Sequence, residues 1–197
     1  MCRTTCFIQN TPGGNVTKKH CYINKIRYLR DAGFFMEKHY IKYYLSPVGW
    51  LQITTDHLNL ISILFADKEE KSDEDIPQIL QETITQLMEY FEGTRKFFQL
   101  KLAPSGTGFQ QKIWKLVENV PFGETAAYLD IALKSGSEKN TRAVGLANGK
   151  NPIPIVIPCH RIIGNNGKLT GYAGGLDKKR WLLAHEQKHA PKENLLF

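Results

Sequence analysis

The sequence predicts an α+β fold in two parts, a small α+β domain with an antiparallel sheet followed by a helical domain. Strand-like segments crowd residues 40–65, helical periodicity dominates residues 109–147, and a run rich in Pro and Gly at 103–108 separates the two patterns. The chain has 197 residues, of which 42% are hydrophobic and 23% are charged. This is the composition of a globular protein and excludes a disordered or collagen-like chain.

The first of these domains is expected over residues 36–103. Three segments rich in β-branched and aromatic residues are separated by turn signals, which is typical of an antiparallel meander. They are residues 40–45, 50–55 and 58–65. The charged stretch 67–75 predicts a loop. After Ile76 and Pro77, apolar residues at helical spacing from Ile79 to Phe91 predict a helix that ends at Gly93.

The second domain is expected over residues 104–197. Apolar periodicity and capping residues predict three helices in it. They are residues 109–120, a helix capped by Thr125 that ends near Gly136, and a helix capped by Ser137 that runs through Ala147. The last two surround a Ser-Gly-Ser turn and fit a helix-turn-helix, a pattern that ordinary αα-hairpins also satisfy.

Residues 1–35 fit neither domain. They contain turn chemistry at 11–15 and no sustained period, so we expect a flexible basic arm or the product of an early start codon. No secretory signal and no apolar run long enough to cross a bilayer is present. We therefore expect a cytoplasmic protein, or a nuclear one in a eukaryote, without a membrane partner.

Charge is distributed unevenly along the chain. The formal net charge is +7, made up of +5 in residues 1–35, −4 in residues 36–103 and +6 in residues 104–197. Such asymmetry favours nucleic acid as the partner of the basic C-terminal part.

Three of the four cysteines lie in the first 35 residues. Cys2, Cys6 and Cys21, together with His20, match no closed zinc-site spacing well. We expect no metal and no cofactor. A secreted disulfide framework is equally poorly supported, so we expect reduced thiols.

The fourth cysteine, Cys159, is the candidate nucleophile. It follows an apolar run and a proline, and it precedes His160 and Arg161. A neighbouring base or cation lowers the pKa of a thiol and so activates it. A lone cysteine is more often a buried structural residue, and adjacent residues need not point the same way.

The segment around Cys159 resembles the active-site signature of the O6-alkylguanine-DNA alkyltransferase family. The resemblance covers residues 104–187 in order, and residues from 40 onward resemble the N-terminal, ribonuclease-H-like domain of that family more loosely. The motifs that carry it are NPIPIVIPCHR at 151–161, PFGETAAY at 121–128, TRAVG at 141–145, GYAGGL at 171–176 and WLLAHE at 181–186.

The resemblance implies a direct and irreversible transfer of the O6-alkyl group of guanine to Cys159, once per protein molecule. His160 would act as the base through a water, and Glu186 would orient His160. Asn151 would brace the turn that carries the thiol. Tyr128 would supply a proton to the departing guanine and contact a phosphate, although a tyrosine on a helix more often only packs.

The resemblance also implies double-stranded DNA as the partner, bound by a monomer through the minor groove with the damaged nucleotide rotated out. Arg142 would fill the vacated stack, although a lone helical arginine is usually a solvated surface residue. Ala143, with Gly145 and Ala147, would form a flat surface toward the groove. Contacts to the flanking DNA backbone are expected from Leu129 and Asn165. Attraction to the DNA phosphates is expected from Lys134, Lys139 and Lys150.

The alkylguanine pocket would be formed by residues that lie after the thiol or close before it. Backbone groups near Cys159 and Ile162 would bind the base edge, and Tyr172 would form a wall. Ala173 stands where some members carry a hydroxyl, so we expect weaker hydrogen bonding to O6. The pocket residues are Tyr172, Ala173, Ile162 and Pro154.

Two other functions fit parts of the sequence. A module that only binds alkylated DNA would lack the acceptor, and Cys159 speaks against it. A cysteine hydrolase using Cys159 and His160 would not need DNA, and the predicted helix-turn-helix with its basic surroundings disfavours that function.

Overall fold

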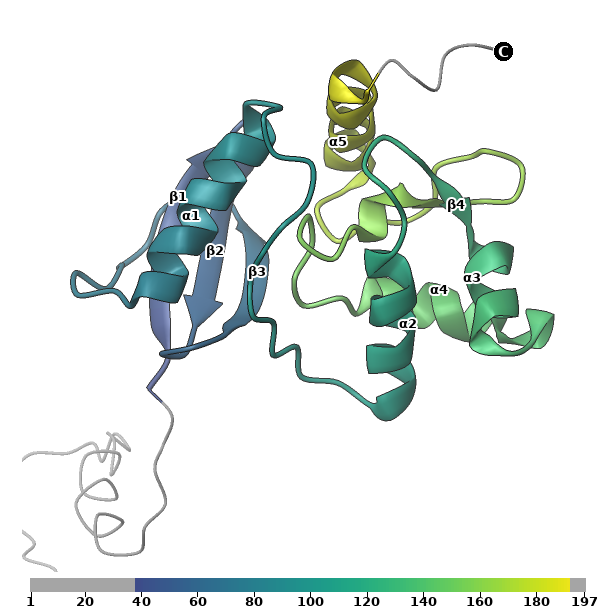
Figure 1. Cartoon of the computed structure of the whole chain (residues 1–197), viewed down its shortest axis with the longest axis horizontal. Coiled ribbons are helices and arrows are strands. Elements are labelled where there is room, and N and C mark those ends of the chain that lie inside the picture. Colours follow the sequence, from purple (N-terminus) through teal and green to yellow (C-terminus); the bar gives the residue numbers. More distant parts are fainter. Residues whose placement is uncertain (1–37, 192–197) are drawn as a thin grey trace, which may run out of the picture. The chain divides into compact units, whose positions relative to one another are not determined.

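A computed structural model describes residues 38–191 (Figure 1). These residues all belong to one compact unit. The basic leader and the zinc alternative at Cys2, Cys6, His20 and Cys21 lie outside the described residues. Within residues 38–191, no helix is both long and apolar enough to cross a membrane.

The first part of the described chain is a three-stranded antiparallel sheet with one helix on it, which confirms the predicted meander. Strand order is β1-β2-β3, and α1 contacts all three strands (Figure 1). The elements are β1 (Tyr40–Ser46), β2 (Gly49–Thr55), β3 (Leu60–Ala66) and α1 (Gln78–Phe91).

The turn between β1 and β2 requires its glycine. Gly49 has φ +100°, a region that side chains disfavour, and Ser46 Oγ donates to the Gly49 carbonyl at 2.7 Å. This turn sets Leu45 opposite Trp50 and Tyr44 opposite Leu51 across the sheet. Leu51 is fully buried in the resulting register, because successive side chains alternate between faces.

The second part is helical, as predicted, with two short additional strands. Its elements are α2 (Gly108–Glu118), β4 (Ala126–Ala127), α3 (Tyr128–Ser135), η1 (Glu138–Asn140), α4 (Thr141–Gly149), η2 (Cys159–Arg161), β5 (Ile162–Ile163) and α5 (Leu176–His189).

Helix α2 begins at the end of the predicted linker, with Thr107 as its capping residue. Thr107 Oγ1 accepts from the Gln110 amide at 3.3 Å, and Gln110 Oε1 accepts from the Thr107 amide at 2.8 Å. This reciprocal pair satisfies two amides that the helix start leaves unbonded. The preceding residues, 101–103, lie along β3, where Leu60 and Lys101 share a hydrogen bond of 2.8 Å.

The predicted cap at Thr125 is wrong. Ala126 and Ala127 form a strand that pairs in parallel with Ile162 and Ile163, so α3 begins at Tyr128. The Ala127 amide is bonded by Asp130 Oδ2 at 2.8 Å instead. A pairing between segments about 36 positions apart has no local signal in sequence.

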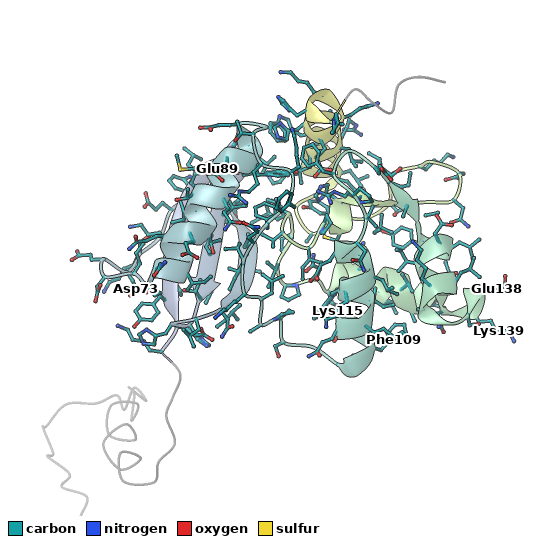
Figure 2. The ribbon with its side chains drawn as sticks, in the orientation of Figure 1. Asp73, Glu89, Phe109, Lys115, Glu138 and Lys139 are labelled. Atoms are coloured by element: carbon teal, nitrogen blue, oxygen red, sulfur yellow. The ribbon has the colours of Figure 1, made fainter. Side chains whose placement is uncertain are left out.

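The turn between α3 and α4 follows the prediction more closely. Gly136 ends α3 with φ +116°, and Ser137 Oγ accepts from the Lys139 amide at 3.2 Å to begin η1. Glu138 and Lys139 project outward from this turn (Figure 2). Both helices pack on α2, where Trp114 Nε1 donates to the Ala147 carbonyl at 2.9 Å.

Candidate active site

The thiol of Cys159 is presented by a buried turn between α4 and η2. Asn151 closes this turn, because its Nδ2 donates to the Ile157 carbonyl at 2.8 Å and its Oδ1 accepts from the Ile153 amide at 3.0 Å. Ile155 has φ +75° and is fully buried, an unfavourable conformation for a β-branched residue. The turn is therefore held in a strained shape by its surroundings.

Cys159 itself is 4% exposed. Burial raises the pKa of its thiol to about 11, and the Asn151 side chain and the Lys179 ammonium oppose that effect. The expectation that adjacent cations activate the thiol is wrong in this respect, because desolvation disfavours the thiolate. The neutral thiol therefore requires a base to remove its proton at neutral pH.

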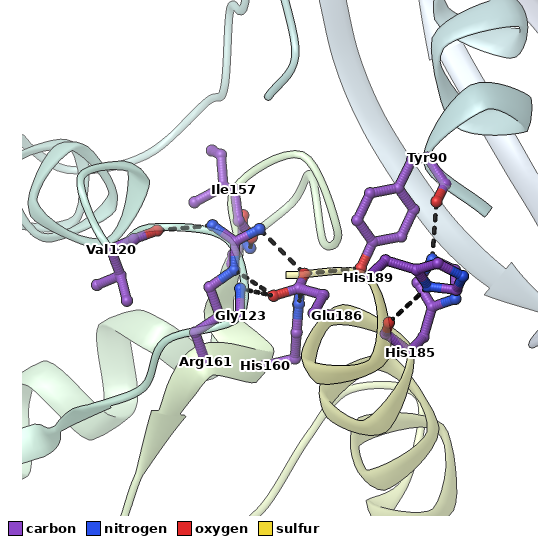
Figure 3. Close-up of polar contacts among 10 residues, drawn as sticks. Tyr90, Val120, Gly123, Ile157, His160, Arg161, His185, Glu186 and His189 are labelled. Atoms are coloured by element: carbon purple, nitrogen blue, oxygen red, sulfur yellow. Dashed lines mark hydrogen bonds and ion pairs between the residues drawn. The ribbon is translucent and has the colours of Figure 1, made fainter. Parts of the chain in front are cut away.

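His160 has the geometry of that base. It is fully buried, and its Nε2 lies 2.7 Å from Glu186 Oε1 (Figure 3). Because a carboxylate only accepts, Nε2 carries the hydrogen. Burial lowers the pKa of His160, which keeps the ring neutral. Its Nδ1 is buried without a hydrogen-bond partner in the described chain, so a lone pair is available there.

The Glu186 carboxylate makes most of the side-chain hydrogen bonds of the site. Its two oxygens accept hydrogen bonds from four residues. Burial alone would raise the pKa of its carboxyl, but His160 and Arg161 outweigh burial and hold that pKa far below the ordinary value. The donors are Tyr90 Oη at 2.7 Å, His160 Nε2 at 2.7 Å, Gly123 N at 3.1 Å and Arg161 Nε and Nη2 at 2.8 and 3.0 Å (Figure 3).

Arg161 supports Glu186 rather than the thiol. Its third nitrogen, Nη1, donates to the Val120 carbonyl at 2.6 Å, so each guanidinium nitrogen makes a hydrogen bond. The cation that acts on Cys159 is Lys179, whose Nζ donates to the Ile162 carbonyl at 2.6 Å and the Thr170 carbonyl at 3.3 Å. Burial lowers the pKa of Lys179, and Cys159 opposes that effect.

Four residues of the site were not predicted from the sequence or were given another role. Asn148 Nδ2 donates to the Cys159 carbonyl at 3.3 Å, which connects α4 directly to the reactive turn. Lys179 is fully buried in α5, a mostly polar helix, and nothing in the neighbouring sequence indicates that burial. These four residues are Tyr90, Asn148, Arg161 and Lys179.

The predicted DNA-contacting residues lie on and near α3 and α4. Arg142 and Ala143 are exposed on α4, and Leu146 on the same face is 64% exposed. Ala147 is buried, so the expectation that it lies on that surface is wrong. Leu129 is half-buried on α3, and Asn165 is exposed in the loop after β5.

Tyr128 lies between α4 and the loop before α5. A Cβ at Gly145 would be 3.9 Å from the Tyr128 ring, an ordinary contact distance, so α4 lies directly beside the tyrosine. Thr170 Oγ1 donates to Tyr128 Oη at 3.1 Å. The proton of the tyrosine is therefore free to be donated elsewhere.

The predicted pocket residues are only partly gathered. Tyr172 packs edge-on against Phe65 and lies 6.4 Å, centroid to centroid, from His160. Its hydroxyl is buried without a partner among residues 38–191. Ala173 is exposed, whereas Ile162 and Pro154 are buried, and the Ile162 carbonyl already accepts from Lys179.

A pocket of about 600 Å³ also borders the reactive turn. Val156, Pro158 and Arg161 contribute to its wall along with Phe97, Phe98 and Phe122. None of the four predicted pocket residues lines it.

Both parts of the described chain match a known protein family. Residues 108–188 match the model described as 6-O-methylguanine DNA methyltransferase, DNA binding domain, and residues 39–104 match the model described as its ribonuclease-like domain. The chain belongs to the 6-O-methylguanine DNA methyltransferase family. The α+β fold expected from the sequence is the fold of this family.

Relatives of this family span nearly the whole described chain. A methylated-DNA–protein-cysteine methyltransferase of Methanosarcina barkeri is 52% identical over 151 residues, which cover 73% of this chain and 94% of the relative. The constitutive protein of Bacillus subtilis is 42% identical over 158 residues, which cover 75% and 94% of the two chains.

Solved structures show the same arrangement. The O6-methylguanine methyltransferase of Mycobacterium tuberculosis superimposes with a TM-score of 0.71 at 39% identity, covering 81% of this chain and 99% of that one. A structure of the same protein in complex with DNA gives a TM-score of 0.69 at 40% identity, with coverage of 77% and 94%.

Burial of the thiol predicts a specific loss of stability in alkali. In the unfolded chain the Cys159 thiol ionises at its ordinary pKa of 9.0, but in the folded chain it ionises only at about 11. The unfolded state therefore loses its proton first, and the free energy of unfolding falls by about 2 kcal/mol between about pH 8.5 and 11 from this group. Urea unfolding of the wild type and of Cys159→Ser measures it. An equal alkaline loss in both proteins would contradict the assignment.

Proposed function

We propose that this chain repairs DNA by taking the O6-alkyl group of guanine onto Cys159. The observation that carries the proposal is the buried Cys159 beside a neutral His160, which Glu186 orients through a 2.7 Å contact. Membership of the 6-O-methylguanine DNA methyltransferase family supports the same reaction.

The transfer balances as a displacement at carbon. The thiol proton passes through a bridging water to Nδ1 of His160, and the sulfur attacks the alkyl carbon. The bond between that carbon and O6 breaks, and its electrons remain on guanine. Tyr128 supplies a proton to the departing base. The imidazolium of His160 then releases its proton to solvent and the Tyr128 phenolate regains one, so both side chains return to their neutral forms. The product is a thioether at Cys159, which no group of the site can reverse, so each molecule acts once.

The exposed face of α4 is proposed to enter the minor groove. Arg142, Ala143 and Leu146 share this face, and apolar and cationic side chains of this kind are used to occupy unstacked base steps. The relative from Mycobacterium tuberculosis has been solved in complex with DNA. The cations proposed to attract phosphates are all exposed: Lys134, Lys139 and Lys150.

Extrusion of the damaged nucleotide is part of the proposal, because a thiol that is 4% exposed cannot reach a stacked base. Arg142 would take the vacated place. The turned-out base would lie beside Tyr172 and Ala173, with Leu129 and Asn165 on the flanking backbone. We propose that one copy of the chain supplies all of these groups and acts as a monomer.

The stoichiometry of repair tests this function. With a large excess of duplex containing O6-methylguanine, the amount of guanine restored should equal the amount of protein, and Cys159→Ser should restore none. Tight binding without restored guanine would replace the proposal with a damage-binding module. Restoration of many guanines per protein would indicate a turnover enzyme.

A further inference from the structure

Tyr90 connects the N-terminal part of the fold to the catalytic relay. It lies in the last turn of α1 and is fully buried. Its hydroxyl donates to Oε1 of Glu186 at 2.7 Å, and Nε2 of His160 lies 2.7 Å from the same oxygen (Figure 3). Arg161 Nη2 also donates to this oxygen, at 3.0 Å. Tyr90 is therefore the donor that the N-terminal part of the fold contributes to the carboxylate oxygen that contacts His160.

The ring of Tyr90 is fixed independently of its hydroxyl. It packs against Phe98 and Phe122 with centroids 5.5 and 6.0 Å away. His185 Nε2 lies 2.7 Å from the Tyr90 carbonyl oxygen, which fixes the backbone. A phenylalanine would supply the same apolar packing, and a buried hydroxyl is costly unless it is bonded. The hydroxyl therefore calls for an explanation other than packing.

We propose that Tyr90 is a positioning residue for alkyl transfer, whose hydroxyl holds the Glu186 carboxylate against His160 so that the imidazole remains a free base. The inference rests on the proposed function. Tyr90 acts through Glu186 and makes no hydrogen bond to Cys159 or His160 in the described chain.

The effect follows from how charge is shared on Oε1. A hydroxyl that donates to this oxygen draws negative charge away from His160. Without it, more negative charge faces Nε2, which favours the imidazolium. An imidazolium carries a hydrogen on Nδ1 and cannot accept the thiol proton. The titratable and charged groups around His160 are Cys159, Arg161, Tyr172, Lys179 and Glu186.

Tyr90→Phe tests the proposal, because it removes the hydroxyl and keeps the ring. Tyr44→Phe is the matched control, since Tyr44 also belongs to the sheet domain, with its ring 6.3 Å from Phe91, and makes no hydrogen bond to Glu186. The titration of the His160 ring is followed by NMR, and the single-turnover transfer rate is measured as a function of pH.

In Tyr90→Phe the His160 midpoint should rise by about one pH unit, the scale of one hydrogen bond to a charged group. Below both midpoints the transfer rate should fall about tenfold, and the two proteins should converge at alkaline pH. Tyr44→Phe should behave as wild type in both measurements.

An unchanged midpoint and pH profile in Tyr90→Phe, with only a lower melting temperature, would overturn the inference and leave a packing role. An equal shift in Tyr44→Phe would overturn it as well. Failure of the proposed function is distinguishable, because the wild type would then transfer no methyl group while the NMR titration would still report on Tyr90.

Discussion

Glu186→Gln is expected to slow methyl transfer by at least about 10²-fold and to destabilise the fold by about 3–5 kcal/mol. The carboxylate accepts five hydrogen bonds from Tyr90, Gly123, His160 and Arg161. An amide replaces one acceptor oxygen with a donor, so at least one pair of donors must face each other. The buried Arg161 also loses its counter-charge, and His160 loses the group that orients it.

Asp177→Asn is the control for this variant. It makes the same chemical change on the same helix, but the Asp177 side chain is 98% exposed, so its effect on stability should stay within about 0.5 kcal/mol. Urea unfolding and single-turnover transfer are compared at a temperature where circular dichroism shows both variants folded. Transfer at the wild-type rate in Glu186→Gln would remove Glu186 from the relay.

Arg142→Ala is expected to slow transfer from duplex DNA by about 10–100-fold without unfolding the protein. Extrusion of a base costs a few kcal/mol, and each 1.4 kcal/mol lost corresponds to a factor of about ten. The Arg142 side chain is exposed and makes no hydrogen bond or ion pair within residues 38–191, so its removal should change stability by no more than about 0.5 kcal/mol.

Lys139→Ala separates stacking from simple charge. Lys139 is also exposed, at the turn before α4 (Figure 2), and it should contribute only salt-dependent attraction to phosphate. In Lys139→Ala the slope of the logarithm of the DNA-binding constant against the logarithm of the salt concentration should fall in magnitude by about one. The deficit of Arg142→Ala should shrink when O6-methylguanine is placed in an unpaired position. An equal deficit in Lys139→Ala, or one that is independent of pairing, would contradict the role of Arg142.

The elements with strong local signals could be predicted from the sequence. Turn chemistry at Gly49 and periodic apolar residues in α1 and α2 are short-range features, and the structure follows them. The helix start at Thr125 could not be predicted correctly, because the strand at Ala126–Ala127 exists only through its pairing with Ile162–Ile163.

The candidate site shows the same division. Cys159 and His160 lie in one motif, and resemblance to the family brings in Glu186. Tyr90 is 96 positions from Glu186, so only the folded chain reveals their contact. Lys179 had no local signal either, because a lysine in a charged segment is ordinarily solvated. The high pKa of the thiol depends on burial, which adjacency to His160 and Arg161 does not indicate.

The most direct test of the central claim is to locate the transferred group. The protein is incubated with duplex DNA containing O6-methylguanine, and its mass and that of its peptides are measured. One methyl group per molecule, on the peptide that contains Cys159 and absent in Cys159→Ser, is the predicted result. A methyl group on Cys2, Cys6 or Cys21, or no gain in mass while the DNA is repaired, would contradict it.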